Sequence, residues 1–246
     1  MLKKAIALMS LLLLSSAGFA KESGITCLCE DIGLEASAKT GMYSQYISRG
    51  VTSDNDPVVQ NDFFVAYRGF NFDYWTSMPA TVDRDALDSN EIDLNLSYGL
   101  DFEQYSFRVG HISYQYSITN GLPTREWFVS AASKSDPISW CFTYYNDYDQ
   151  FKGNYFSIDL ERAYSAAQNS IITITPFLHV GAYSNYSIFK NGGDLVLGSK
   201  GAFKLLEHLA FVPALYYSIP YGDVADEKIG NEKAAFVGGA NFEFSF

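Results

Sequence analysis

Residues 91–101 alternate strictly between two kinds of side chain. Ile92, Leu94 and Leu96 begin an apolar series, whereas Glu91 and Asp93 begin the polar series that alternates with it. Because successive side chains of a β-strand point to opposite faces, this pattern predicts a strand with an apolar and an aqueous side. A membrane barrel, with lipid outside and water inside, contains such strands. A soluble sandwich does too, with the acidic face as its outer surface, so one strand leaves both folds open.

The last predicted strand, 234–246, alternates in the same way and ends the chain on an aromatic residue. Phe242, Phe244 and Phe246 share one face, and Glu243 lies on the other between Asn241 and Ser245. A terminal phenylalanine on such a strand resembles the C-terminal signature of bacterial outer-membrane proteins, which the barrel assembly machinery reads. The resemblance implies that Phe246 is an assembly signal and that Glu243 points into a barrel.

The N-terminus has the pattern of an export signal. Lys3 and Lys4 precede an apolar run over 5–14, and small residues follow up to Ala20. The run is about half of the ~20 residues that a spanning helix needs, so it predicts a cleaved signal peptide over 1–20 rather than an anchor. We expect a short periplasmic extension over 21–33 and a single barrel over 34–246, with no second domain.

Composition supports strands that are apolar on one side only. Aromatic residues make up 16% of the chain, yet no long apolar run follows the signal peptide. This combination is typical of membrane barrels with aromatic girdles, although a secreted sandwich is also rich in strands. The net charge of −11 disfavours a nucleic-acid partner and favours cationic over anionic solutes.

Alternation and turn signals predict twelve strands of about the length that a tilted strand needs to cross a bilayer. Ten or fourteen strands remain possible, because 70–78 and 193–205 alternate less cleanly. The predicted ranges are 35–51, 58–68, 70–78, 91–102, 105–116, 124–134, 138–147, 154–164, 170–184, 193–205, 209–219 and 234–246.

The connections between these strands alternate in length. The long ones are 52–57, 79–90, 117–123, 148–153, 185–192 and 220–233, and the short ones are 69, 103–104, 135–137, 165–169 and 206–208. Outer-membrane barrels have short periplasmic turns and longer outer loops, whereas a sandwich has no reason to sort its loops in this way. We therefore predict an all-β, antiparallel, up-and-down transmembrane β-barrel with both chain ends in the periplasm of a Gram-negative bacterium.

The stretch 46–52, Tyr-Ile-Ser-Arg-Gly-Val-Thr, followed by Pro57 and Gln60, resembles the start of the TorF-type porins, also called the Gcw_chp family. Their first hairpin carries a Tyr-x-x-Arg-Gly-x-Ser motif, in which Thr52 replaces the serine here. The aromatic stretch 69–75, the Glu91-Ile92-Asp93 sequence and Glu126 also resemble the family. The resemblance covers about the first half of the mature chain. It implies an outer-membrane barrel of porin type, without assigning a substrate or binding residues.

Charged side chains on the predicted inner face are the candidate functional residues. They are expected either to line a water-filled channel or to fill the barrel as mutually satisfied ion pairs. Arg49, within the motif, is the first candidate, and its alternative role is a structural salt bridge near Asp62. The predicted pore-lining residues are Arg49, Asp62, Arg68, Asp73, Glu91, Asp93, Arg108, Glu126, Asp159, Glu161, Lys200, Lys204 and Glu243.

A second reading of the sequence is enzymatic. His111 and Ser113 fall on the same strand face, which resembles the His-x-Ser of outer-membrane phospholipase A. That family continues with Asn-Gly, whereas Tyr114 and Gln115 follow here and Asn120 comes too late. We therefore do not expect an enzyme.

No metal site or cofactor is expected either. Cys27 and Cys29 supply two thiols, fewer than a structural zinc site needs, and Cys141 is distant in sequence. The acidic loops 82–88 and 222–228 lack the EF-hand pattern and are interpreted as ordinary solvated surface. Loose binding of divalent cations at the lipopolysaccharide layer is the less favoured alternative.

Together these patterns predict an outer-membrane channel for passive diffusion of small hydrophilic solutes. The alternative is a barrel without conduction that serves as a structural or surface-binding protein. The expected partners are membrane lipid, lipopolysaccharide, the barrel assembly machinery and small solutes. The sequence leaves open the solute, the state of the lumen and the oligomeric state.

Overall fold

The computed structural model describes residues 33–80, 90–116, 123–133, 137–165 and 171–246. The predicted signal peptide, all of the extension but Gly33, the acidic loop 82–88 and Asn120 lie outside these ranges. Within them, no helix has the length and apolar character needed to span a membrane.

Twelve antiparallel strands close into a barrel, which confirms the predicted fold class and strand number. Each strand pairs with its neighbour in sequence, and β1 pairs with β15 to complete the circle. A two-residue β11, Tyr164–Ser165, extends the edge between β10 and β12. The barrel strands are β1 (Leu34–Tyr43), β4 (Val58–Tyr67), β5 (Phe70–Pro79), β6 (Glu91–Asp101), β7 (Tyr105–Tyr116), β8 (Thr124–Ser133), β9 (Ser139–Asp147), β10 (Gly153–Glu161), β12 (Ile172–Ser184), β13 (Asn191–Leu206), β14 (Leu209–Gly222) and β15 (Ala235–Ser245).

The period of two places apolar side chains outside and polar side chains inside. On β6, Leu96 and Leu100 are 61% and 51% exposed on the outer face, whereas Glu91 is 4% exposed inside. Phe242 and Phe244 on β15 lie on the same outer surface. Since closure leaves no unpaired edge, the wall satisfies its own backbone groups and can face an apolar solvent.

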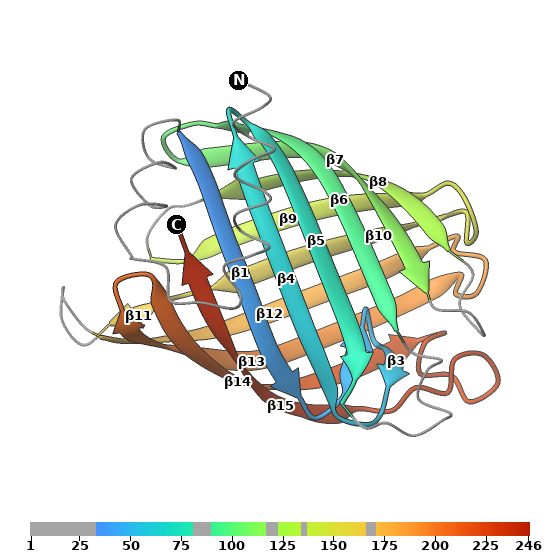
Figure 1. Ribbon diagram of the computed structural model, residues 1–246. Helices are drawn as coiled ribbons and strands as arrows, with labels where there is room; N and C mark the ends of the chain where they lie inside the picture. The colour runs from blue at the N-terminus through green and yellow to red at the C-terminus, as the bar shows by residue number, and fades with distance from the viewer. Residues whose placement is uncertain (1–32, 81–89, 117–122, 134–136, 166–170) are drawn as a thin grey trace.

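The two ends of the barrel differ as the lengths of the connections predicted. Among the described connections, the short turns at 68–69 and 207–208 lie at the end of the barrel where β15 finishes. The longer connections at 185–190 and 223–234 lie at the opposite end (Figure 1). Phe246 is tied into the wall at the turn end, because its amide donates to the Ala36 carbonyl at 2.9 Å. We call these the turn end and the loop end.

The first predicted strand, 35–51, is wrong in its second half. The strand β1 ends at Tyr43, and the chain then forms a separate hairpin of β2 (Tyr46–Ser48) and β3 (Val51–Asp54). The reason is the turn between them: Arg49 and Gly50 both have positive φ, 51° and 81°, as tight two-residue hairpin turns require. We call β2, β3 and this turn the inner hairpin.

Candidate functional site

The inner hairpin crosses the lumen. It leaves the wall between β1 and β4, yet Arg49 at its tip contacts side chains of β8, β9 and β10. Around the closed barrel, β9 lies six strands from β1 in both directions. The hairpin tip therefore reaches the opposite wall, at a level nearer the loop end.

Arg49 is held by a bidentate ion pair. Its Nη1 and Nη2 donate to the two carboxylate oxygens of Glu126, each at 2.7 Å. The hydroxyls of Tyr114 and Tyr186 also donate to this carboxylate, at 2.8 and 3.0 Å. With its side chain only 1% exposed, Glu126 depends on these donors, because a buried carboxylate without them is strongly destabilising.

Aromatic rings hold the same guanidinium by its faces. The Arg49 Cζ lies 4.4 Å from the ring centroids of both Tyr145 and Tyr155. Contacts of this kind stabilise a cation by roughly 0.5–2 kcal/mol each, most where water is excluded. The planar guanidinium can stack and form the bidentate pair at once, which a lysine cannot do.

A buried cluster covers the hairpin tip at the loop end. Tyr155, Tyr183, Tyr186, Phe189 and Val224 form its core, and Val51 of the hairpin packs against them. A Cβ at Gly50 would lie 2.8 Å from the Asp194 Cβ, so the tip approaches β13 as closely as glycine allows. The Thr52 amide donates to Glu232 at 3.1 Å, which ties the hairpin to the connection between β14 and β15.

Tyr186, in the connection between β12 and β13, remains a hydrogen-bond donor to Glu126. Burial, reinforced by the negative charge of Glu126, raises its pKa well above the ordinary tyrosine value. The phenol is therefore neutral across the physiological range and keeps its proton for Glu126. We call the ion pair of Arg49 with Glu126, together with the tyrosines that hold it, the tip lock. Its geometry is thus maintained by a group that does not titrate near neutral pH.

A polar chain continues from the tip lock along the inner wall. The Tyr155 hydroxyl donates to Asp194 at 2.7 Å and lies 3.0 Å from His179 Nε2. The other ring nitrogen of His179 lies 2.6 Å from an Asp159 oxygen. This chain joins β10, β12 and β13 inside the barrel and places His179 between two carboxylates.

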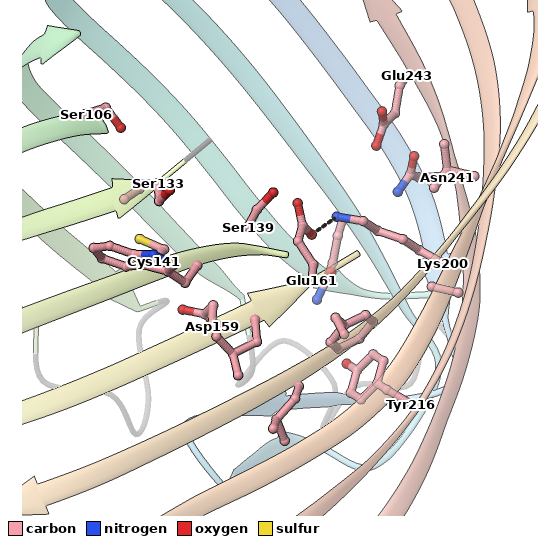
Figure 2. A pocket seen from close by; sticks show the side chains of 18 of the residues that line it. Ser106, Ser133, Ser139, Cys141, Asp159, Glu161, Lys200, Tyr216, Asn241 and Glu243 are labelled. Carbon is pink, nitrogen blue, oxygen red and sulfur yellow. Dashed lines mark hydrogen bonds and ion pairs between the residues drawn. The ribbon is translucent and has the colours of Figure 1, made fainter. Parts of the chain in front are cut away.

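Toward the turn end the lumen holds a cavity of about 780 Å³. Glu161, Lys200 and Glu243 point into it, together with serine and asparagine side chains (Figure 2). Lys200 Nζ lies 2.9 Å from Glu161, and both side chains are 46% exposed, so this ion pair is solvated. This half of the barrel holds an open cavity with charged and apolar side chains in its lining, whereas the other half is occupied by the inner hairpin.

The structure brings together only some of the residues predicted to line a pore. Asp159, Glu161, Lys200 and Glu243 line the large cavity, Asp73 and Arg108 line a smaller one of about 200 Å³, and Asp73 and Asp93 line a third. Glu91 and Glu126 are buried on the inner wall at the level of the hairpin.

Three placements differ from the expected ones. The predicted alternative partner of Arg49 is wrong, because Asp62 pairs with Lys39 at 3.1 Å while Arg49 pairs with Glu126. Arg68 lies in the turn between β4 and β5, exposed and with φ 51°, and its guanidinium lies over the Tyr67 ring. Lys204 lies beside an irregularity near the turn end of β13, away from the three cavities.

Sequence reasoning missed the partners of Arg49 that are not charged. Tyr114, Tyr145 and Tyr155 contact the guanidinium, but tyrosine is common throughout this chain and carries no distinguishing signal. The hydrogen bond between His179 and Asp159 was also not predicted. The alternation of β10 and β12 already placed both on one face, and that was the available signal.

The residues of the enzymatic reading have other partners. His111 Nε2 lies 2.8 Å from the Tyr148 hydroxyl, and the Ser113 hydroxyl accepts from Gln115 at 2.8 Å. Across the described ranges, no group of three or more histidine, cysteine or acidic residues is arranged to hold a metal ion. Asp223, in the described acidic loop, accepts backbone amides of Lys190 and Asn191 instead.

The barrel resembles solved porin structures. The KdgM porin in complex with disordered oligogalacturonate matches with a TM-score of 0.52 and 12% identity, over 86% of this chain and 99% of that one. The NanC porin matches with a TM-score of 0.53 and 11% identity, over 86% and 100% of the two chains. No family model matches the chain, and no curated protein matches its sequence.

These likenesses define the class of fold. The chain forms a porin-like β-barrel, and at this level of identity the likeness concerns the fold alone. The resemblance to the TorF-type porins stays a prediction.

Proposed function

We propose that the protein is an outer-membrane channel for passive diffusion of small hydrophilic solutes, narrowed on the loop side by its inner hairpin. The observation that supports this most is the cavity of about 780 Å³, with charged side chains in its lining, at the turn end of a closed barrel. A barrel of eight strands is filled by its own side chains, whereas one of 16–18 leaves an aqueous channel. Twelve strands fall between these cases, so the contents of the lumen decide passage.

We expect purified, refolded protein to produce discrete conductance steps in a planar bilayer. The steps should be small, because the inner hairpin leaves little free cross-section at its level. The acidic lumen should favour cations over anions, which the reversal potential in a salt gradient measures. The absence of steps across salt concentrations and voltages, both in the parent protein and in a variant with a released hairpin, would contradict the channel.

A second candidate is a barrel without conduction, and the lock on Arg49 is the observation that favours it. If the ion pair of Arg49 with Glu126 never opens, the inner hairpin remains fixed in the lumen and blocks it. In that case the loop end, with its long connections, would serve as a binding surface facing the lipopolysaccharide layer. The same bilayer experiment separates the two candidates.

The bacterial outer membrane is the proposed location, and the barrel assembly machinery is a proposed partner. The outer apolar surface and the position of Phe246 at the turn end support both. Deleting Phe246 should lower the amount of folded barrel in the outer membrane several-fold, as measured by heat-modifiable mobility in electrophoresis. Refolding in detergent should be nearly unchanged, because the residue contributes one backbone pair. Unchanged membrane yield would rule out the assembly signal.

A further inference from the structure

The large cavity at the turn end continues into a second, smaller one. Ser106 of β7 and Cys141 of β9 line the large cavity (Figure 2). The next residues on the same face toward the loop end are Arg108 and Thr143, and both line the second cavity, of about 200 Å³. The Thr143 hydroxyl lies 3.6 Å from the Cys141 Sγ, so the two linings meet.

The second cavity continues in turn into a third beside the inner hairpin. The third cavity, of about 270 Å³, shares Asp73, Asn95 and Ile112 with the second and is bounded by Tyr46 of the hairpin. Of these three cavities the second is the smallest, so the row narrows there. We call the second cavity the narrow cavity. A solute that moves along this row, past the inner hairpin, goes through it.

Arg108 brings an unpaired positive charge to the narrow cavity. Among the described residues that line the three cavities, Lys200 pairs with Glu161, whereas Arg108 forms no ion pair. The Arg108 side chain is exposed, and its stem lies against Gly99, where an added Cβ would come 3.4 Å from the Arg108 Cγ. The charge of this guanidinium therefore acts on whatever occupies the cavity.

The cavity that precedes it is acidic. Asp159, Glu161 and Glu243 line the large cavity, with Lys200 as the basic member of the lining. Such a surface raises the local concentration of cations and lowers that of anions. An anionic solute that enters from the turn end is therefore repelled until it reaches Arg108.

The chemistry of the guanidinium matches the solutes that the acidic lining repels. Arginine presents paired N–H donors to the two oxygens of a carboxylate or phosphate group. Walls of low dielectric constant strengthen the effect of one charge in a narrow passage. We propose that Arg108 determines the charge selectivity of solute entry into the narrow cavity and admits small solutes that carry a carboxylate or another anionic group. The consequence for transport rests on the proposed channel.

A cysteine beside Arg108 tests this selectivity without any need for conduction. Ser130 of β8 is the strand partner of Arg108 and also lines the narrow cavity. In a protein in which Cys27, Cys29 and Cys141 are replaced by serine, Ser130→Cys supplies the single thiol. The barrel folded in detergent is reacted with two methanethiosulfonates of similar size, one carrying a sulfonate and one a trimethylammonium group. Taking the ratio of the two rates cancels the effect of Arg108 on the ionisation of the thiol.

We expect Arg108→Gln to lower the ratio of the anionic to the cationic rate about tenfold. Neighbouring strands are only about 5 Å apart, and the charge acts on the two reagents in opposite directions. Arg108→Lys keeps the charge and should retain most of the parent ratio. Arg68→Gln removes a charge from an exposed turn and should leave the ratio unchanged. Equal ratios with and without the Arg108 charge, or no reaction of the Ser130→Cys protein with either reagent, would overturn the proposal.

Reversal potentials in a salt gradient extend the test to conduction. Arg108→Gln should raise the permeability of cations relative to anions about twofold or more, because the acidic residues then act alone. Conductance with an unchanged reversal potential in this variant would overturn the role of Arg108 and leave the proposed channel intact. Absence of conductance together with charge-dependent labelling would contradict the channel and support the selective entry of anions.

Discussion

Replacing Arg49 with alanine is expected to raise single-channel conductance roughly threefold or more, because current grows with the free cross-section of a water-filled pore. The substitution removes the ion pair to Glu126 and the contacts with Tyr145 and Tyr155 that hold the hairpin tip against the far wall. Without them the inner hairpin keeps other contacts, such as the packing of Val51 and the hydrogen bond from the Thr52 amide to Glu232. The measurement is the step size in a planar bilayer.

Two control variants make this result specific. Arg49→Lys keeps the charge but loses the bidentate geometry and the stacking, so it should give an intermediate step size. Arg68→Ala removes an equal charge from an exposed turn outside the tip lock and should leave the size of the conductance steps unchanged. Steps of the same size in the parent protein and in Arg49→Ala would show that the hairpin does not limit passage.

Replacing Glu126 with alanine is expected to lower the free energy of unfolding by about 3–5 kcal/mol, the usual cost of leaving one member of a buried ion pair alone. The variant leaves the Arg49 guanidinium without its carboxylate partner and removes the acceptor for the Tyr114 and Tyr186 hydroxyls. Urea unfolding of the folded barrel in detergent, followed by tyrosine and tryptophan fluorescence, measures the loss. The matched control is Glu161→Ala, whose solvated pair with Lys200 should contribute less than about 1 kcal/mol.

A double-mutant cycle tests whether this loss belongs to the pair. Combining Arg49→Met with Glu126→Leu removes both charges and keeps much of their volume, so the double variant should recover most of the lost stability. Additive losses in the two single variants would mean that the two residues act independently. Such additivity would contradict a stabilising interaction between Arg49 and Glu126.

Much of the wall followed from the sequence alone. On β6 the alternation of Leu96 and Leu100 with Asp93 and Asp101 distinguished the outer from the inner face before any strand was paired. Turn signals then gave the strand number, and the lengths of the connections gave the two ends. These features are local, since period two follows from strand geometry and turn signals lie within a few residues.

The contents of the lumen did not follow from the sequence. The motif at 46–52 marked Arg49 as a residue of interest. Alternation, however, placed Arg49 at the end of a continuous first strand, where Asp62 on the next strand was the expected partner. The observed partner, Glu126, lies 77 residues away on the opposite side of the barrel. The contact between the rings of Tyr46 and Trp75 likewise depends on the inward fold of the hairpin.

By itself the sequence determined the barrel: its strands, its two faces, its two ends and the acidic character of its interior. Only the tertiary structure decided that the first outer hairpin folds inward. A tight turn with two positive φ values can project into solvent as readily as into a lumen, and its direction depends on the contacts available after closure. Those contacts, a buried carboxylate and stacked tyrosines from strands far apart in the chain, exist only once the circle is complete.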